Sequence, residues 1–178
     1  MDDEQPIEVA APVEGRQEGA PSFEGFFRRE YRQVLGLAFV LSGSRTAAEE
    51  LTMEAFEAAL ADWLRVSQLD SPGAWVRKVV SNASASRFRR QAAERRAKAR
   101  MTGDARLWQL DGLGDPGVWE SVRDLPRRQA QVVALFYVDG YQRREIAQVL
   151  GISEESVKTH LERGRSRLRE VLGDDDEG

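Results

Sequence analysis

The sequence predicts an all-α protein made of two small helical domains, and three observations lead to this fold class. In several stretches apolar residues recur every three to four positions, which is the spacing of one helix face. Residues that cap or break helices separate these stretches, as at Ser42 to Ser44, Ser71-Pro72 and Asp139-Gly140. A chain of 178 residues is also long enough for one or two domains of this kind.

Composition sets the expected boundaries of the domains. Residues 1–21 combine Glu, Pro, Gly and Gln with few apolar residues, which is typical of a disordered acidic arm. We expect a first helical domain over 22–100, a flexible linker rich in Gly and Asp over 101–117, a second domain over 118–172 and an acidic tail at 173–178. Each domain is small, so its core is marginal and a bound partner would stabilise it.

The first domain opens with two amphipathic helices. Aromatic and aliphatic residues at helical spacing predict the first helix from Phe23 to about Leu41. Thr46 and Glu49 match a capping box and predict the start of the second helix. Its outward face is acidic with one apolar residue, Met53, in it. Such a face is usually just solvated, and a basic protein partner is the sharper interpretation.

A third helix is expected to begin at Ser71 and Pro72, a cap followed by proline at the first helical position. Its outward side mixes basic residues with hydrogen-bonding Ser and Asn, which suits a nucleic-acid surface. These residues are Arg77, Lys78, Ser81, Asn82 and Arg89. Trp75 is either a core side chain or a platform on which a base stacks.

The second domain is expected to end in a helix-turn-helix between Tyr141 and Arg169. Gly151 breaks a short amphipathic helix, and Ser153 is a good N-cap for the next helix. The outward face of that helix carries hydrogen-bond donors, and arginines crowd its distal half as phosphate anchors would. The donors are Lys158, Thr159, His160 and Arg163. This pattern favours a helix that enters the DNA major groove over two helices that merely pack a domain.

Composition also excludes several function classes. The chain has no cysteine and a single histidine, His160, so disulfides, thiolate metal sites and two-histidine metal sites are ruled out. We expect no enzyme activity, no metal and no cofactor. No stretch approaches the roughly 18 apolar residues of a membrane helix, and no export signal is visible, so a cytoplasmic protein is expected.

The net charge of −4 hides a separation of charge along the chain. Acidic residues gather in 1–21 and at 174–177, whereas 87–106 is strongly basic. Local fields decide nucleic-acid binding more than the total charge does. One hypothesis is that the acidic ends screen the basic helices in the free protein.

Motifs in both domains resemble one protein family. The segment AEELTMEAF at 48–56 is similar to the family's A-E-D-L-x-Q-E-x-F, and Pro72, Ala74-Trp75 and Asn82 are similar to its P-x-A-W-L…N run. The second domain adds Leu125-Pro126, Gly140-Tyr141, Glu145 to Ala147 and Leu150 to Ser153. In order and spacing these motifs resemble the extracytoplasmic-function (ECF) subfamily of sigma-70 RNA polymerase sigma factors, which keep only regions 2 and 4.

The resemblance implies a role for each surface. Residues Glu49, Glu50, Met53, Glu54 and Glu57 would contact core RNA polymerase. Residues Trp75, Arg77, Lys78, Ser81, Asn82 and Arg89 would open the −10 element of promoter DNA. Residues Glu155, Ser156, Lys158, Thr159, His160, Arg163, Arg165 and Arg167 would read the −35 element. The segment 107–110 would thread toward the RNA exit path of the polymerase, and an anti-sigma factor is implied by the family alone.

Some positions depart from the family pattern and leave alternatives open. Met53 and Ser86 replace a glutamine and an aspartate, and Gly164 stands on the apolar stripe where alanine is common, which predicts close packing there. His160 makes the helix similar to that of LuxR-type regulators, so a second hypothesis is a regulator that binds operator DNA without acting as a sigma factor. A third is an adaptor that uses its helices for protein contact only.

Overall fold

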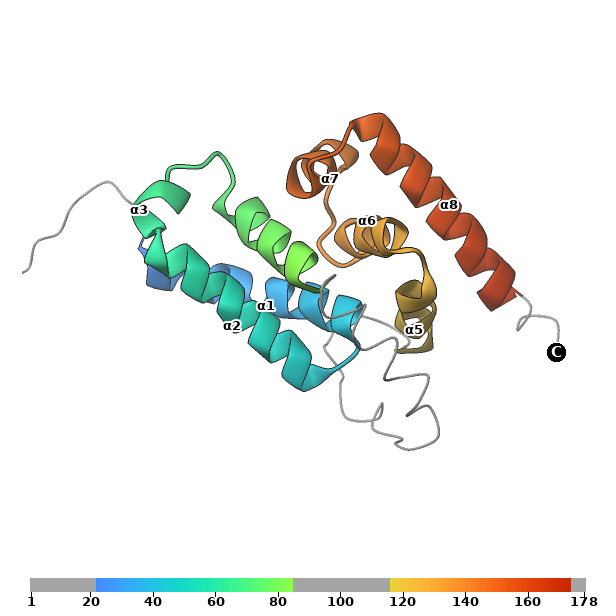
Figure 1. The fold of residues 1–178 in the computed structure, drawn as a ribbon, viewed down its shortest axis with the longest axis horizontal. Helices are drawn as coiled ribbons and strands as arrows, with labels where there is room; N and C mark the ends of the chain where they lie inside the picture. Colours follow the sequence, from blue (N-terminus) through green and yellow to red (C-terminus); the bar gives the residue numbers. More distant parts are fainter. Residues whose placement is uncertain (1–21, 85–115, 174–178) are drawn as a thin grey trace, which may run out of the picture.

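A computed structural model describes residues 22–84 and 116–173, and every regular element in these two ranges is a helix. Figure 1 shows their arrangement. The helices are α1 (Phe23–Ser42), α2 (Arg45–Ala61), α3 (Trp63–Val66), a helix over 72–84, α5 (Pro116–Asp124), α6 (Arg127–Tyr137), α7 (Arg143–Leu150) and α8 (Glu154–Leu172). The all-α prediction is confirmed. The expected acidic arm, Arg89, most of the expected linker and 174–178 lie outside the described residues.

The helix ends correct two expectations for the first unit, which we define as residues 22–84. Ser44 is the N-cap of α2, because its side-chain oxygen accepts a hydrogen bond from the Ala47 N–H. The prediction of a capping box that begins at Thr46 is therefore wrong. Glu49 instead accepts a hydrogen bond from Arg45, Nε to Oε1 at 2.7 Å. The polar residues of 65–71 predict a loop before the third helix, but the short helix α3 extends over Arg65 and Val66.

Aromatic rings hold the N-terminal end of α1 against the C-terminal end of α2. Phe26 and Phe56 are buried, and their ring centroids lie 5.7 Å apart in an edge-on arrangement. Trp63 of α3 closes the cluster, with its ring centroid 4.9 Å from that of Phe26. These contacts fix the antiparallel α1–α2 pair, on which the 72–84 helix lies (Figure 1).

The second unit, residues 116–173, contains the expected helix-turn-helix. Gly151 ends α7 with φ of 64°, a left-handed conformation that glycine adopts without steric cost. The Ser153 side chain then caps α8 by accepting from the Ser156 N–H at 3.1 Å. α6 packs against α8 through Val133 and Gly164, so α8 is held by a buried contact.

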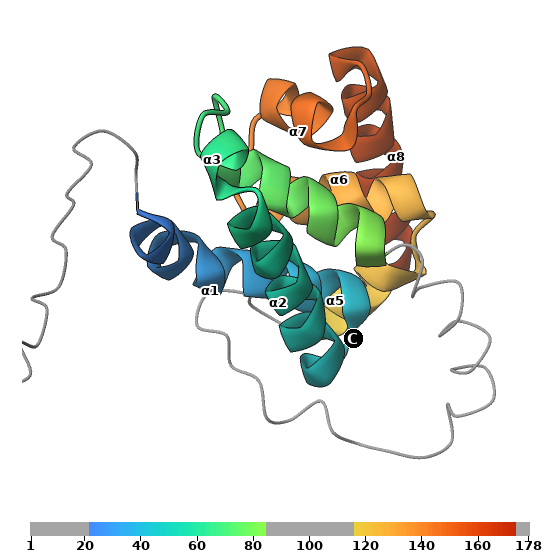
Figure 2. The same ribbon diagram turned by 60° about the vertical axis from the view of Figure 1, so that its left-hand side comes forward.

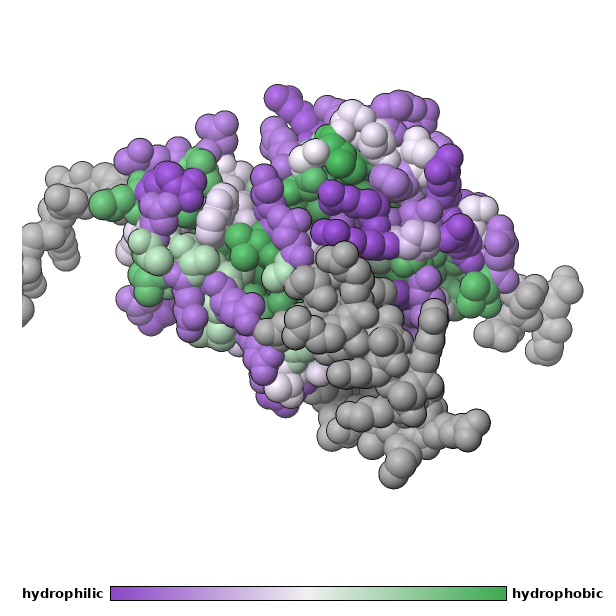
Figure 3. Space-filling model, viewed as in Figure 1, coloured by the Kyte–Doolittle hydropathy of each residue, from purple (hydrophilic) through white to green (hydrophobic). Residues whose placement is uncertain are grey.

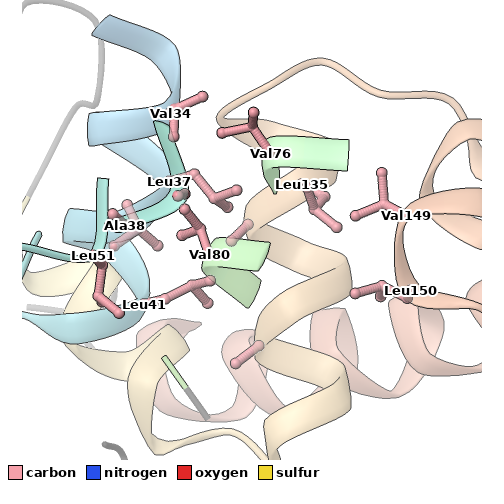
Figure 4. Close-up of a cluster of buried hydrophobic side chains, with 14 of the residues drawn as sticks. Val34, Leu37, Ala38, Leu41, Leu51, Val76, Val80, Leu135, Val149 and Leu150 are labelled. Atoms are coloured by element: carbon pink, nitrogen blue, oxygen red, sulfur yellow. The ribbon is translucent and has the colours of Figure 1, made fainter. Parts of the chain in front are cut away.

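The two units share one continuous hydrophobic core, which the sequence did not predict. Figure 2 shows the 72–84 helix, in green, between the α1–α2 pair and α6. In the close-up of Figure 4, Val76 and Val80 of this helix lie between Leu37 of α1 and Leu135 of α6. All four side chains are fully buried. The units are therefore packed together rather than held only by the chain between them.

The close α6–α8 contact predicts that Gly164→Ala destabilises the protein. A Cβ at this position would lie 2.9 Å from Cγ2 of Val133, which is buried and has little room to move. Overpacking costs about 1–3 kcal/mol, which exceeds the gain of about 1 kcal/mol in helix propensity. We expect a net loss of about 1 kcal/mol in urea denaturation, whereas the exposed Ser166→Ala on the same helix should change it by less than about 0.5 kcal/mol. A gain in stability for Gly164→Ala would contradict this packing.

Candidate nucleic-acid and partner interfaces

The outward face of α8 carries most of the residues expected to read the −35 element. Glu155, Lys158, Arg163 and Arg167 are exposed, whereas Ser156, Thr159, His160 and Arg165 are half-buried. Lys158 lies 4.0 Å from Glu155, a surface pair that contributes little and leaves the ammonium free to reorient. The exposed cations are therefore available to a polyanion.

His160 lies beside two arginines at the edge of this face. Burial and the charges of Arg128 and Arg163 lower the pKa of His160 below its ordinary value, so the ring is neutral near pH 7. Its Nδ1 atom is buried with no hydrogen-bond partner among the described residues. His160 therefore adds no positive charge to the face.

Arg165 is held by aromatic residues of α6 and is not simply a free phosphate anchor. Its Nε donates to the Tyr137 hydroxyl at 2.8 Å. The guanidinium also lies over the rings of Phe136 and Tyr137, at 5.1 and 5.5 Å from their centroids. Together with Phe136, Arg143 and Lys158 it lines a groove between α6, α7 and α8. The expected DNA contact of Arg165 would have to compete with these interactions.

On the 72–84 helix the structure separates the expected −10 residues into two groups. Lys78 and Asn82 are exposed. Trp75 is half-buried, and the guanidinium carbon of Arg65 lies 6.0 Å from the centroid of the Trp75 ring. Arg77 and Ser81 have only 1% of their surface exposed, so in this arrangement they face protein rather than DNA. Both lie where the first unit meets the second, so this arrangement does not present them to DNA, and their DNA contact stays a prediction.

Arg77 bridges the two units through a buried cluster of charged groups. Its Nε donates to Asp139 Oδ1 at 2.7 Å, and its Nη1 donates to Glu30 Oε2 at 2.8 Å. The guanidinium also lies 5.1 Å from the centroid of the Tyr141 ring. Burial alone would lower the pKa of Arg77, but Asp139, Tyr141 and Glu30 raise it overall, so the group stays charged. Burial raises the pKa of Asp139 despite the opposite effect of Arg77.

The outward face of α2 is acidic at its start and apolar at its end. Glu50, Glu54 and Glu57 are exposed, as expected, and Glu49 is partly covered in its pair with Arg45. Met53 is 41% exposed, as predicted for an apolar residue within this acidic face.

Two further exposed apolar residues, Leu60 at the end of α2 and Leu64 in α3, were not predicted from the sequence. Leu60 and Leu64 are 54% and 77% exposed, which is unusual for leucine. Met53, Glu57, Leu60 and Leu64 are spaced as one helical stripe, and that spacing was the signal that could have found them. Figure 3 shows apolar surface over the α2 and α3 side of the molecule. We call Met53 and Leu60 of α2, together with Leu64 of α3, the apolar stripe of α2.

Comparison with known families assigns the two units. Residues 26–94 match the family model described as sigma-70 region 2, and residues 118–168 match sigma-70, region 4. The chain belongs to the sigma-70 family. Its relatives include the ECF RNA polymerase sigma factor SigE of Mycolicibacterium smegmatis, 27% identical over 89% of this chain and 64% of that protein. SigM of Mycobacterium tuberculosis is 28% identical over 85% of this chain and 78% of its own length. These sigma-70 relatives place the chain in the ECF subfamily.

Solved structures share the fold at low sequence identity. The sigma factor RpoE of Bartonella quintana, solved with the anti-sigma factor NepR, matches with a TM-score of 0.69 and 20% identity over 86% of this chain and 98% of that one. CnrH, solved with the cytosolic domain of CnrY, matches with a TM-score of 0.60 and 21% identity over 86% of this chain and 89% of that one. The sigma-70 fold with two helical units is thus shared with these proteins.

The described residues were also searched for membrane-spanning helices and for clusters of metal-binding side chains. No described helix has the length and apolar character needed to cross a membrane. Within residues 22–84 and 116–173, no three His, Cys, Asp or Glu side chains come together as a metal site would require.

Proposed function

We propose that the protein is an ECF-type sigma factor that binds core RNA polymerase and directs transcription to promoters with −10 and −35 elements. The observation that carries the proposal is the pairing of a region 2 unit and a region 4 unit, each with an exposed face of the expected chemistry. As a sigma factor the protein would perform no catalysis itself, and it would act in the cytoplasm, where core polymerase works.

The region 4 unit is proposed to read the −35 element with α8. Its exposed Lys158 and Arg163 can donate to base edges or phosphates in the major groove, and Arg167 can contact a phosphate. On the region 2 unit, Lys78, Asn82 and Trp75 are the described residues with exposed or half-exposed side chains that are proposed to contact the −10 element. A base taken out of the stack costs a few kcal/mol, which contacts such as stacking on Trp75 would have to recover.

Core polymerase is proposed to dock on α2 and α3. The apolar stripe of α2 supplies the side chains that a stable interface buries, and the acidic residues Glu50, Glu54 and Glu57 surround it with charge complementary to a basic partner. An exposed apolar stripe rimmed by charge is typical of a protein-contact surface.

This docking proposal predicts that Leu60→Glu weakens binding to core polymerase. A buried carboxylate within the contact and the loss of a leucine side chain together should lower the affinity at least about 10-fold, as measured by fluorescence titration. Leu60 is already exposed, so the thermal unfolding of the free protein should stay unchanged. Arg28→Glu, at an exposed position of α1, serves as the control, and equal affinities for the two variants would argue against the site.

An anti-sigma factor is a further proposed partner. RpoE and CnrH, which share the fold, were each solved with a second protein, NepR and the cytosolic domain of CnrY. The test is co-purification of the tagged chain from the cell that encodes it.

Run-off transcription with purified core polymerase tests the main proposal. We expect RNA chains from defined start sites only when both proteins are present, and weak binding of the free protein to duplex DNA. An operator-binding regulator would instead bind one duplex tightly without polymerase. An adaptor would leave transcription unchanged when Lys158 and Arg163 are replaced.

A further inference from the structure

Tyr137 is the last residue of α6, and it is 52% exposed although most of its side chain is apolar. Its hydroxyl oxygen accepts a hydrogen bond from Nε of Arg165 at 2.8 Å. The ring of Phe136 stands at 74° to the ring of Tyr137, with 5.1 Å between the two centroids. The two rings therefore form a corner, and the Arg165 guanidinium lies over both of them.

This corner leaves the outer end of the guanidinium pointing away from α6. An arginine has five N–H donors, and the bond to Tyr137 uses only the one on Nε. Within the part of the chain that the structure describes, Nη1 and Nη2 of Arg165 make no hydrogen bond. Glu154 and Glu162 line the same groove, but neither forms an ion pair with Arg165. The positive charge is thus held in place without a described carboxylate to neutralise it.

Arg165 lies on one flank of the face of α8 that is proposed to meet DNA. At about 100° per residue, Lys158 and Arg165 differ by only about 20° around the helix and so share this flank, whereas Arg163 lies about 160° from Arg165. Arg143, at the start of α7, lines the groove beside Lys158 and Arg165. The flanks of a helix in the major groove face the phosphate backbones, so this basic flank would meet one backbone. This step rests on the proposed function.

We propose that Tyr137 is a positioning residue for promoter binding, which holds Arg165 so that Nη1 and Nη2 donate to a phosphate of the −35 element. An unconstrained arginine loses rotamer freedom when it binds, and a side chain already held in its binding conformation loses less. A phosphate that accepts from Nη1 or Nη2 leaves the Tyr137 bond intact, whereas one that approaches Nε would have to displace it. Arg165 therefore contacts the backbone and not a base edge.

Tyr137→Phe tests the proposal, because it removes the hydroxyl and keeps the ring. Titration of a fluorescent promoter fragment with holoenzyme at several salt concentrations measures the affinity. We expect a loss of affinity of about 3- to 10-fold with an unchanged salt dependence, since Arg165 keeps its charge. Arg165→Ala should lower the affinity further and reduce the salt dependence by about one counterion. Tyr31→Phe, which removes a hydroxyl from α1, should match wild type.

A double-mutant cycle separates positioning from a structural role of Tyr137. If Tyr137 acts through Arg165, adding Tyr137→Phe to Arg165→Ala should change the affinity by less than about 2-fold. An equal loss in both backgrounds would mean that Tyr137 supports the fold of the second unit instead, and it would overturn the proposal. Equal affinities of wild type and Tyr137→Phe would overturn it as well. Absence of promoter binding by the wild-type holoenzyme would count against the sigma-factor function.

A second measurement needs neither DNA nor polymerase. In the free protein the Nε–H proton of Arg165 should exchange slowly with water by NMR, because the Tyr137 hydroxyl accepts from it. Tyr137→Phe should speed this exchange at least about 10-fold, whereas the signal of the exposed Arg167 should not change. Arg165→Lys assigns the signal by removing it. Equal exchange rates of the Arg165 proton in wild type and Tyr137→Phe would refute the positioning, whatever the titrations give.

Discussion

Replacing Arg77 with methionine is expected to lower the free energy of unfolding by about 3–5 kcal/mol. Methionine fills much of the same space, but it leaves the carboxylates of Asp139 and Glu30 without their cation, and the Asp139 side chain is fully buried. Small domains are stable by only about 5–15 kcal/mol, so the loss is a large part of the total. Urea denaturation followed by circular dichroism measures it.

Lys78→Met on the same helix provides the matched control. Lys78 is exposed, so the loss of its charge should change the unfolding free energy by less than about 0.5 kcal/mol. Adding Asp139→Leu to Arg77→Met should recover part of the lost stability, because the buried carboxylate is then removed as well. If Arg77→Met unfolds at the same urea concentration as wild type, the buried cluster does not stabilise the fold.

Replacing Arg163 with alanine is expected to lower run-off transcription from a promoter with a −35 element by about 10- to 100-fold. A specific contact to a base edge is worth about 1–3 kcal/mol, and Arg163 is exposed near the middle of the outward face of α8. Lys158→Ala should weaken binding at all sequences more evenly and reduce the salt dependence by about one counterion. Titration of holoenzyme with labelled promoter at several salt concentrations separates the two effects.

Arg28→Ala controls for the loss of a positive charge far from α8. Arg28 is an exposed arginine of α1 that pairs with Glu24, so its loss should leave both the transcript yield and the salt dependence unchanged. Equal defects in Arg28→Ala and Arg163→Ala would mean that net charge, rather than a contact by α8, governs promoter binding.

The helices could be predicted from the sequence because their causes are local. Periodic apolar residues and the Ser71, Gly151 and Ser153 signals act within a few positions, and the structure has a helix end or start at each. The α2 cap was missed because two capping residues, Ser44 and Thr46, compete within three positions. Sequence periodicity does not say which one adopts the extended conformation that an N-cap needs.

The contact between the units could not be predicted, because its causes are distant in sequence. Arg77 looks like one of several outward basic residues, and its partners Glu30 and Asp139 lie 47 and 62 residues away. A periodic pattern identifies apolar faces but not which faces meet. The apolar stripe of α2 was within reach of sequence reasoning, since the spacing of Leu60 and Leu64 from Met53 was visible.

The core that the two units share also affects how long the protein survives in the cell. A molecule that opens without a partner exposes Val80 and Leu135 to water, and proteolysis follows the fraction of such open molecules. A substitution that weakens the contact between the units, such as Arg77→Met, would therefore shorten the lifetime of the protein in the cell as well as lower its stability.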